Sequence, residues 1–489
     1  MTENKGKLFN HFTVYLLGVL IIQLSRIILI PVYTRYLETY EYGLLEFINR
    51  NLQIIKILFT AGLGAATMSY YCSGTEDGKN KVISTAMIGV VVLGMIAFIC
   101  YQYFIEDISM LFFNNNKYLG IFRGAGVLII TDLMTIVPLT YIRANMKSTH
   151  FILFSIGNFL AIVTINIIMV VILGYKVYGI ILGLIISGVV YSIVLSIYTI
   201  FYVGLNYDWQ IFKKLALFGA PFIPGSIMLF VINNGDRYFI QQMLGGSHLG
   251  IYSFGYTLAS VSMLLIINPF MQIWGPYMFK LDKDSEDRSE FGRIFLYVIT
   301  AYCFVSLGIS IFSKEIIMIV GTYKYHDAYN IVPLICFANI FWVMSLFFDS
   351  GFYIKKVTKY KPLIMGIGCI VAVVSYAVMI PLYGISGAAY ATIVTFFVFA
   401  VFTRVISNKI YAVPYPFVKS AKIIGIGLAL YFAQLNIETD NILIALIFKT
   451  ATLSIYILFI YALKVFEDED IIKIRGGITA FWGKITARA

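Results

Sequence analysis

The chain has 489 residues, of which 60% are hydrophobic and only 12% are charged, and its mean hydropathy is +0.86. Water-soluble proteins carry about 25% charged residues, so this composition excludes a soluble enzyme. The formal net charge of +11 does not indicate nucleic-acid binding in so apolar a chain. In a membrane protein, an excess of Lys and Arg is expected on the cytoplasmic face, where these residues are retained.

Apolar runs of about 20 residues recur from one end of the chain to the other, and each is long enough to cross the hydrocarbon core as a helix. We therefore predict an all-α polytopic membrane protein with about 14 spans. Their predicted limits are 10–32, 42–70, 82–104, 119–142, 151–174, 178–203, 214–235, 248–273, 291–313, 328–352, 362–382, 385–408, 418–435 and 441–463. The first run is longer than that of a signal peptide and has no small-residue cleavage site, so we expect it to be retained.

Two stretches of the chain occur twice, which indicates an internal duplication. Residues 34–47, TRYLETYEYGLLEF, align without a gap with residues 241–254, QQMLGGSHLGIYSF, and this alignment places Gly43 on Gly250. Residues 178–180, YGI, recur at 383–385. The offsets are 207 residues (250 − 43) and 205 residues (383 − 178), and two nearly equal offsets are hard to obtain by chance. Such duplications are common in transporters.

The duplication divides the chain into three predicted parts. Residues 1–203 and 204–410 each form a six-helix bundle, and residues 411–489 add two transmembrane helices and a cytoplasmic amphipathic tail. Because each repeat holds an even number of spans, the pseudo-twofold axis that relates the bundles should run along the membrane normal. The loops carry roughly 25 basic residues on one side and roughly six on the other, which predicts that both termini are cytoplasmic.

Charged residues inside spans are energetically costly and are candidates for function by default. Arginine and lysine in a wet cavity between the bundles would suit a phosphate group, which guanidinium binds in a bidentate manner. The predicted substrate-binding residues are Arg26, Arg50, Lys56 and Arg237. Structural alternatives exist: Arg237 and Asp236 could cap a helix end, and Arg50 could only neutralise Glu46 four residues away.

Carboxylates and prolines within spans provide two further predictions. Asp132 and Glu46 are the predicted ion-coupling residues, because a carboxylate in a low-dielectric site can take up and release a proton near neutral pH. The alternative for Asp132 is a hydrogen bond within the bundle. A hinge is predicted at Pro221, Pro224 and Gly225 in the seventh span, where a static kink is the alternative. Lys449, outside the duplication, is expected to be structural or to face a partner.

Motifs of enzymes are missing from the sequence. Residues 74–79, GTEDGK, are too short for a Walker A loop, and the four histidines are scattered. The five cysteines have no metal-like spacing and are interpreted as small packing residues. We therefore predict a protein that is not an enzyme and that holds neither a cofactor nor a metal.

Several stretches of the sequence resemble those of a known family of membrane proteins. The N-terminal stretch LSRIILIPVYTRYLETYEYGLLEF, followed by AGLGAATMSYY, resembles the same region of Wzx-type polysaccharide flippases. VYGIILGLIIS, INNGDRYFIQQMLGGSHLGIYSFGYTLAS and LYGISGAAYATIV are also similar to stretches that recur in that family. The likeness covers nearly the whole chain. The superfamily also holds MurJ lipid II flippases and MATE drug exporters.

The resemblance implies a V-shaped pair of bundles that moves an undecaprenyl-pyrophosphate-linked oligosaccharide from the inner to the outer leaflet by alternating access, driven by an ion gradient. The polymer would be a surface polysaccharide such as O-antigen or capsule. A cationic cavity is implied, with Arg26, Lys56 and Arg237 as candidates for its lining. The expected partners are the lipid-linked oligosaccharide, membrane lipid, a coupling proton or sodium ion, and a polymerase or other assembly protein. A monomer that binds no nucleic acid is expected.

Two other classes of function are weighed against the flippase. A MATE-like cation-coupled multidrug exporter would have an acidic, aromatic cavity, whereas the intramembrane charges here are mostly basic. MATE exporters also usually stop at twelve spans, while MurJ has two more, which form a groove for the lipid tail. A membrane enzyme would need a large outer loop or a His/Asp pair within a span, and the sequence has neither.

Overall fold

The computed structural model describes residues 28–60, 62–73, 76–114, 116–284, 288–436 and 441–462. The regular elements within these residues are all helical, which confirms the predicted class. The first bundle contains α2 (Thr39–Thr60), α3 (Leu63–Ser73), α4 (Glu76–Phe113), α5 (Leu119–Ala125), α6 (Val127–Ala144), α7 (Ser148–Ile167), η1 (Ile168–Ile172) and α8 (Lys176–Val203). Residues 28–36, before α2, are also helical.

The linking helix α9 (Trp209–Gly219) leads into the second bundle. That bundle contains α10 (Phe222–Met243), α11 (Gly246–Ser262), η2 (Met263–Ile267), α12 (Asn268–Asp284), α13 (Ser289–Ile311), α14 (Ser313–Val320), η3 (Tyr323–Asn330), α15 (Ile331–Phe348), α16 (Ser350–Ile354), η4 (Thr358–Tyr360) and α17 (Lys361–Ile410). Two further helices follow, α18 (Phe417–Leu435) and α19 (Ile442–Ala462).

The described residues hold 11 helices that are long and apolar enough to cross a membrane, or up to 12 if the bent pair α9–α10 is one span. The 50 residues of α17 would measure about 75 Å as one helix, against about 30 Å of hydrocarbon core. Gly384, with φ 61° and ψ −139°, divides α17 into two helices, which matches the predicted limits 362–382 and 385–408. Most of the predicted span 10–32 lies outside the described residues, so the total of 14 stays a prediction.

Two predicted spans have different limits in the structure. The span predicted at 42–70 is divided into α2 and α3, because Gly62 has a φ of 81°, outside the right-handed helical region. The span predicted at 214–235 is α10, which begins after Pro221 and differs in direction from α9 by 44°. Asp236 and Arg237 therefore lie inside α10, and the alternative that they cap a helix end is wrong.

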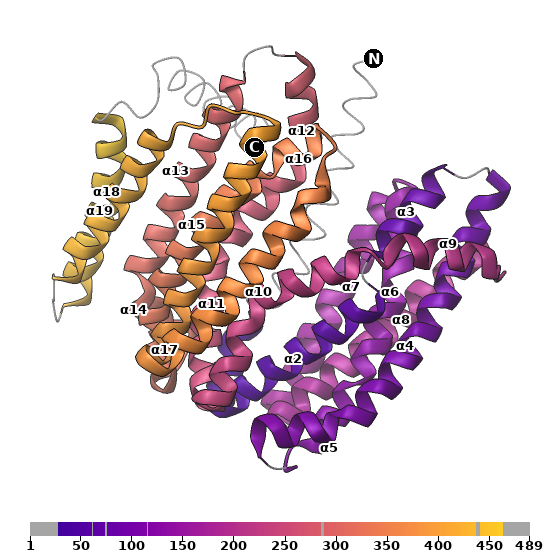
Figure 1. Ribbon diagram of the computed structural model, residues 1–489. Coiled ribbons are helices and arrows are strands. Elements are labelled where there is room, and N and C mark those ends of the chain that lie inside the picture. The colour runs from indigo at the N-terminus through magenta and orange to yellow at the C-terminus, as the bar shows by residue number, and fades with distance from the viewer. Residues whose placement is uncertain are drawn as a thin grey trace, which may run out of the picture.

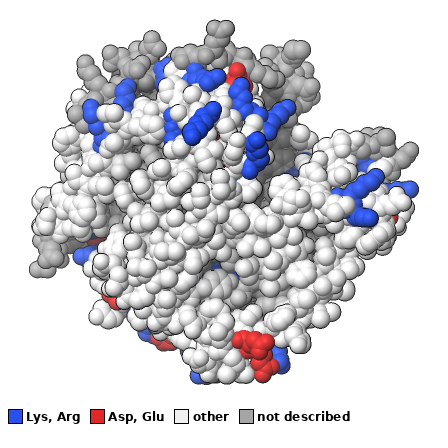
Figure 2. Space-filling model, in the orientation of Figure 1, with Lys and Arg blue, Asp and Glu red and all other residues white. Residues whose placement is uncertain are grey.

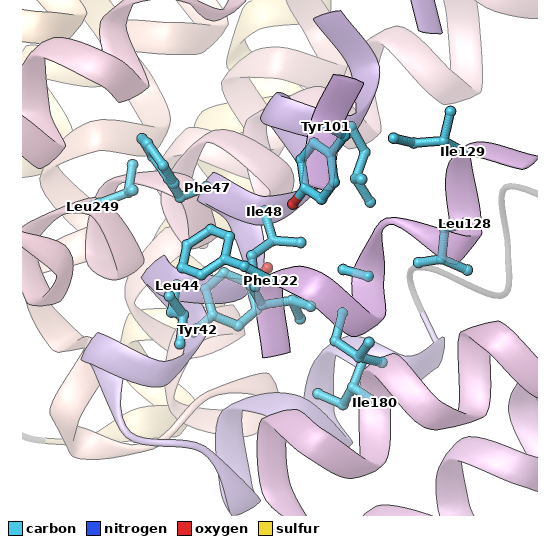
Figure 3. Packing of buried hydrophobic residues seen from close by; sticks show 14 of the residues in the cluster. Tyr42, Leu44, Phe47, Ile48, Tyr101, Phe122, Leu128, Ile129, Ile180 and Leu249 are labelled. Atoms are coloured by element: carbon cyan, nitrogen blue, oxygen red, sulfur yellow. The ribbon is translucent and has the colours of Figure 1, made fainter. Parts of the chain in front are cut away.

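Figure 1 shows the two bundles in contact at one end of the molecule and diverging toward the other, with α9 lying across the first bundle. Between the bundles, α2 packs against α10 and α11. The largest buried hydrophobic cluster is continuous across this contact and includes Phe47 of α2 and Leu249 of α11 (Figure 3). We call the end where residues 34–43 meet residues 246–254 and 319–325 the joined end.

Charge is unevenly distributed along the molecule. Figure 2 shows Lys and Arg gathered at the end opposite to the joined end, while the middle of this face is almost free of charged side chains. We call this the basic end. The exposed lysines in the segments near α9, α12 and α16 are Lys213, Lys214, Lys280, Lys355, Lys356 and Lys359. The uncharged middle is the band expected to contact lipid tails.

The helices α18 and α19 pack against α13 at the edge of the second bundle (Figure 1). Lys449 of α19 donates hydrogen bonds to both carboxylate oxygens of Glu315, at 2.5 and 2.7 Å. Thr452 of α19 donates to Gln434 of α18 at 2.9 Å. Lys449 therefore has the structural role that was one of its two expected roles, because it ties α19 to α14.

Candidate functional site: paired charges on the wall between the bundles

The helix α2 leaves the contact with the second bundle partway along its length. Its buried residues end at Leu52, and residues 53–60 are partly or largely exposed. The α2 helix lies at the edge of the first bundle that faces the second (Figure 1). Residues 50–56 therefore lie where the two bundles begin to diverge.

Arg50 and Glu46 form the predicted pair on one face of α2. Arg50 Nη2 donates to Glu46 Oε2 at 2.8 Å, and Arg50 Nη1 donates to Gln53 Oε1 at 3.2 Å. The side chains of Arg50 and Glu46 are 26% and 14% exposed. Arg50 Nε is buried without a hydrogen-bond partner among the described residues. The guanidinium thus has a spare donor, although its charge is balanced.

Lys56 and Asp132 form a second pair, which joins α2 to α6. Lys56 Nζ donates to Asp132 Oδ2 at 2.5 Å. The side chains are 27% and 52% exposed, so both can be reached from outside the protein interior. The structure thus brings together a predicted substrate-binding residue and a predicted ion-coupling residue that are 76 positions apart.

Arg237 lies in a third pair, which is buried. Arg237 Nη1 donates to both oxygens of Asp236, at 2.7 and 2.8 Å, and the Tyr252 hydroxyl donates to Asp236 at 2.5 Å. The Tyr256 ring covers the guanidinium, with 3.9 Å from its centroid to Arg237 Cζ. The side chains of Arg237 and Asp236 are only 3% and 1% exposed. Sequence reasoning missed both tyrosines, although Tyr252 lies in the repeated stretch 241–254 and Tyr256 lies two residues beyond it.

The other predicted site residues are placed as follows. Arg26 lies outside the described residues. Pro221 immediately precedes α10, and Pro224 and Gly225 lie in its first turn, beside the 44° bend between α9 and α10. The bend is at the place where the hinge was predicted. Its movement during transport stays a prediction.

Contacts between the bundles continue beside the pairs. The Tyr238 hydroxyl on α10 donates to Asn51 Oδ1 on α2 at 3.5 Å. Gln241 Nε2 donates to the carbonyl oxygen of Phe112, near the end of α4, at 3.0 Å. These polar contacts could not be read from spacing, because their partners are more than 100 positions apart.

Solved structures with the same fold are membrane transporters. A lipid II flippase, MurJ, in an inward closed conformation has a TM-score of 0.71 and 14% identity, with 95% of this chain and 100% of that chain covered. A multidrug resistance MATE family transporter in an inward-facing conformation has a TM-score of 0.67 and 13% identity, with 80% and 93% covered. A MATE transporter of Vibrio cholerae has a TM-score of 0.59 and 12% identity, with 83% and 96% covered.

Fold and helix composition thus define a multi-pass membrane protein with a MurJ/MATE-like fold. A family described as polysaccharide biosynthesis protein matches residues 32–330, which is more than half of the chain. The chain belongs to this family, and the predicted resemblance to MATE/MurJ-like flippases is confirmed at this level. A search of curated proteins finds no match. That the protein is not an enzyme stays a prediction.

Proposed function

We propose that this protein is a Wzx-type flippase that carries undecaprenyl-pyrophosphate-linked oligosaccharides from the inner to the outer leaflet of the bacterial cytoplasmic membrane. The family membership supports a role in polysaccharide biosynthesis. The observation that carries the proposal is the presence of two accessible cations, Arg50 and Lys56, where α2 emerges between the bundles. By the excess of Lys and Arg, the basic end faces the cytoplasm.

The ion pairs differ in how readily they can exchange a carboxylate for a substrate phosphate. A partly exposed pair contributes only about 0.2–1 kcal/mol, so the phosphates of the head group can displace Asp132 from Lys56 or Glu46 from Arg50. Breaking a buried pair costs about 3–5 kcal/mol, so Arg237 is not the first contact in this conformation. In this mechanism Arg50 and Lys56 bind the anion and Arg237 stays paired with Asp236.

The displaced carboxylate provides a route to ion coupling. Asp132 displaced from Lys56 has lost the cation that balances its charge, so a coupling cation can take the place of Lys56. Binding of the anionic head group would thus be linked to binding of that cation, and release would restore the pair. The membrane potential, about 2.3 kcal/mol per charge per 100 mV, is a second source of energy for the return step.

The alternative is a MATE-like multidrug exporter, since a MATE transporter shares the fold with a TM-score of 0.67, against 0.71 for MurJ. Purified protein in vesicles distinguishes the two. Fluorescent undecaprenyl-pyrophosphate-linked oligosaccharide should reach the far leaflet, as measured by chemical quenching, while a cationic dye should not be moved. Dye movement without lipid movement would favour the exporter.

The residues are tested in the same vesicles. Loss of a charge-assisted hydrogen bond of about 1.5–3 kcal/mol predicts that Lys56→Gln and Arg50→Gln flip the lipid tenfold to a hundredfold more slowly. Arg123→Gln is the matched control, since Arg123 pairs with Glu106 at 3.4 Å and both are about half exposed on α5 and α4. Normal rates in the two α2 variants would remove this site assignment.

A further inference from the structure

The two repeats touch each other through equivalent glycines. Gly43 lies in the first turn of α2 and Gly250 in the first turns of α11. A Cβ atom on Gly43 would overlap the carbonyl oxygen of Gly246 and lie 2.9 Å from Gly250 N. A Cβ atom on Gly250 would overlap the carbonyl oxygen of Thr39. Only hydrogen fits at either position, so the two helices cross with their backbones in contact.

The spacing of these residues is that of a close helix crossing. Gly246 and Gly250 are four positions apart, as are Thr39 and Gly43. Small residues at this spacing allow two membrane helices to approach through van der Waals contact of their backbones. Gly43, Gly246 and Gly250 contribute no side chains to the crossing, and the ring of Tyr40 on α2 packs beside Gly246.

Aromatic side chains and hydrogen bonds surround the crossing at the joined end. Tyr42 of the first repeat, and Phe254 and Tyr325 of the second, form a triad with ring centroids 5.2–6.4 Å apart. The Tyr325 hydroxyl donates to the carbonyl oxygen of Leu37 at 3.3 Å, and Thr34 Oγ1 donates to that of Val320 at 2.7 Å. Tyr325 and Thr34 are 0% and 1% exposed. The contact is therefore dry.

An ion pair lies at the exposed rim of this contact. Lys324 Nζ donates to Glu38 Oε1 at 2.5 Å, and both side chains are 53% exposed. The hydrogen bond from Lys324 lowers the pKa of Glu38. At the rim, the two repeats are joined by an ion pair that water can replace. In the interior of the contact, they are joined by side chains that are buried from water.

We propose that the Gly43–Gly250 crossing is the closing contact of a gate on the joined end, and that the two repeats separate there when the protein opens to that side. The inference rests on the proposed function only in assigning that side to the exterior. The joined end is shut while α2 is uncovered beyond Leu52 toward the basic end. A carrier that alternates between two sides must break the first contact and form another. The glycines make the closed state accessible, since any side chain would hold the helices apart.

Spin labels on the rim test this without any substrate. In a chain whose five cysteines are replaced, labels at Tyr36→Cys and Tyr323→Cys report the distance between the repeats, because both positions are exposed, by 44% and 91%. The parent should give one short distance. Gly43→Ala and Gly250→Ala should each raise the ratio of the long-distance to the short-distance population at least tenfold, as expected for overpacking of a tight contact.

Control glycines separate closure from general destabilisation. Gly157→Ala and Gly366→Ala add a methyl group that meets nothing within 4 Å, so the short distance should persist. Tyr325→Phe removes only the hydrogen bond to Leu37 and should raise the same ratio a few-fold, which provides a reading if Gly43→Ala does not fold. An unchanged short distance in folded Gly43→Ala, or in Tyr325→Phe if the former is lost, would overturn the gate. Loss of flipping has no bearing on this measurement, so the two proposals fail separately.

Discussion

Variants of Arg237 test whether this charge inside a span binds the substrate or stabilises the fold. Arg237→Gln leaves the carboxylate of Asp236, 1% exposed, without its cation. Asp236→Asn leaves the guanidinium, 3% exposed, without its anion. The double variant, with Arg237→Gln and Asp236→Asn together, leaves two neutral amides. The Tyr252 hydroxyl can still donate to the amide oxygen at position 236. These three variants and the parent form a double-mutant cycle.

The magnitude follows from burial. An unpaired charge left in a dry site costs about 3–5 kcal/mol, so each single variant should lose that much free energy of unfolding. The double variant should lose less than either, which gives a coupling energy of about 2–3 kcal/mol. The same cycle on Lys56 and Asp132 should give a coupling energy below about 1 kcal/mol, because those side chains are 27% and 52% exposed.

The assay is unfolding in one detergent by titration with sodium dodecyl sulfate, with flipping measured in vesicles for each folded variant. If both single variants unfold with the parent's free energy, the account of Arg237 as a locked pair is refuted. If the double variant is stable and flips normally, Arg237 is architectural. A stable double variant that does not flip the lipid would show that Arg237 contacts the substrate in another conformation.

Three further predictions concern the hinge, the kink and the docked helices. Pro221→Ala removes the fixed φ just before α10, so that α9 and α10 could align. Lipid flipping should slow severalfold while the thermal midpoint stays unchanged. A normal flipping rate would argue against the hinge. Gly384→Ala should cost about 1–3 kcal/mol and lower the thermal midpoint, because a φ of 61° with a ψ of −139° is a conformation that residues with a Cβ atom rarely adopt, whereas Gly366→Ala should not; equal midpoints would contradict this strain. Lys449→Met leaves Glu315 unpaired but 29% exposed, so a loss of about 1 kcal/mol is expected, and an unchanged midpoint would show that α19 docks by packing alone.

Sequence patterns predicted those features that depend on local chemistry. Apolar run lengths predicted the helices, and the predicted limits 362–382 and 385–408 placed a break at Gly384. The predicted limits of the seventh span, 214–235, were wrong. Hydropathy alone does not show where α9 ends and α10 begins, because apolar residues continue from one helix into the other. For the same reason, Arg237 was considered as a residue that caps a helix end, although it lies inside α10.

Pairing between distant positions could not be predicted. The pair Glu46–Arg50 was visible because four residues make one helical turn, whereas Lys56 and Asp132 meet only through the packing of α2 on α6. The alignment of the repeats matched Gly43 with Gly250, yet equivalence in sequence does not say that two residues touch. That contact depends on where the pseudo-symmetry axis passes, which only the three-dimensional arrangement reveals.

Both accessible ion pairs belong to one bundle, since Glu46 and Arg50 lie on α2 and Lys56 on α2 meets Asp132 on α6. In the proposed mechanism, a substrate bound by Arg50 or Lys56 keeps these contacts unchanged while the second bundle moves relative to the first. Contacts that are equal in both states cannot bias the equilibrium between them, however tightly they hold. In the proposed mechanism, binding by Arg50 and Lys56 therefore does not set the direction of transport, which depends instead on the ion gradient or the membrane potential.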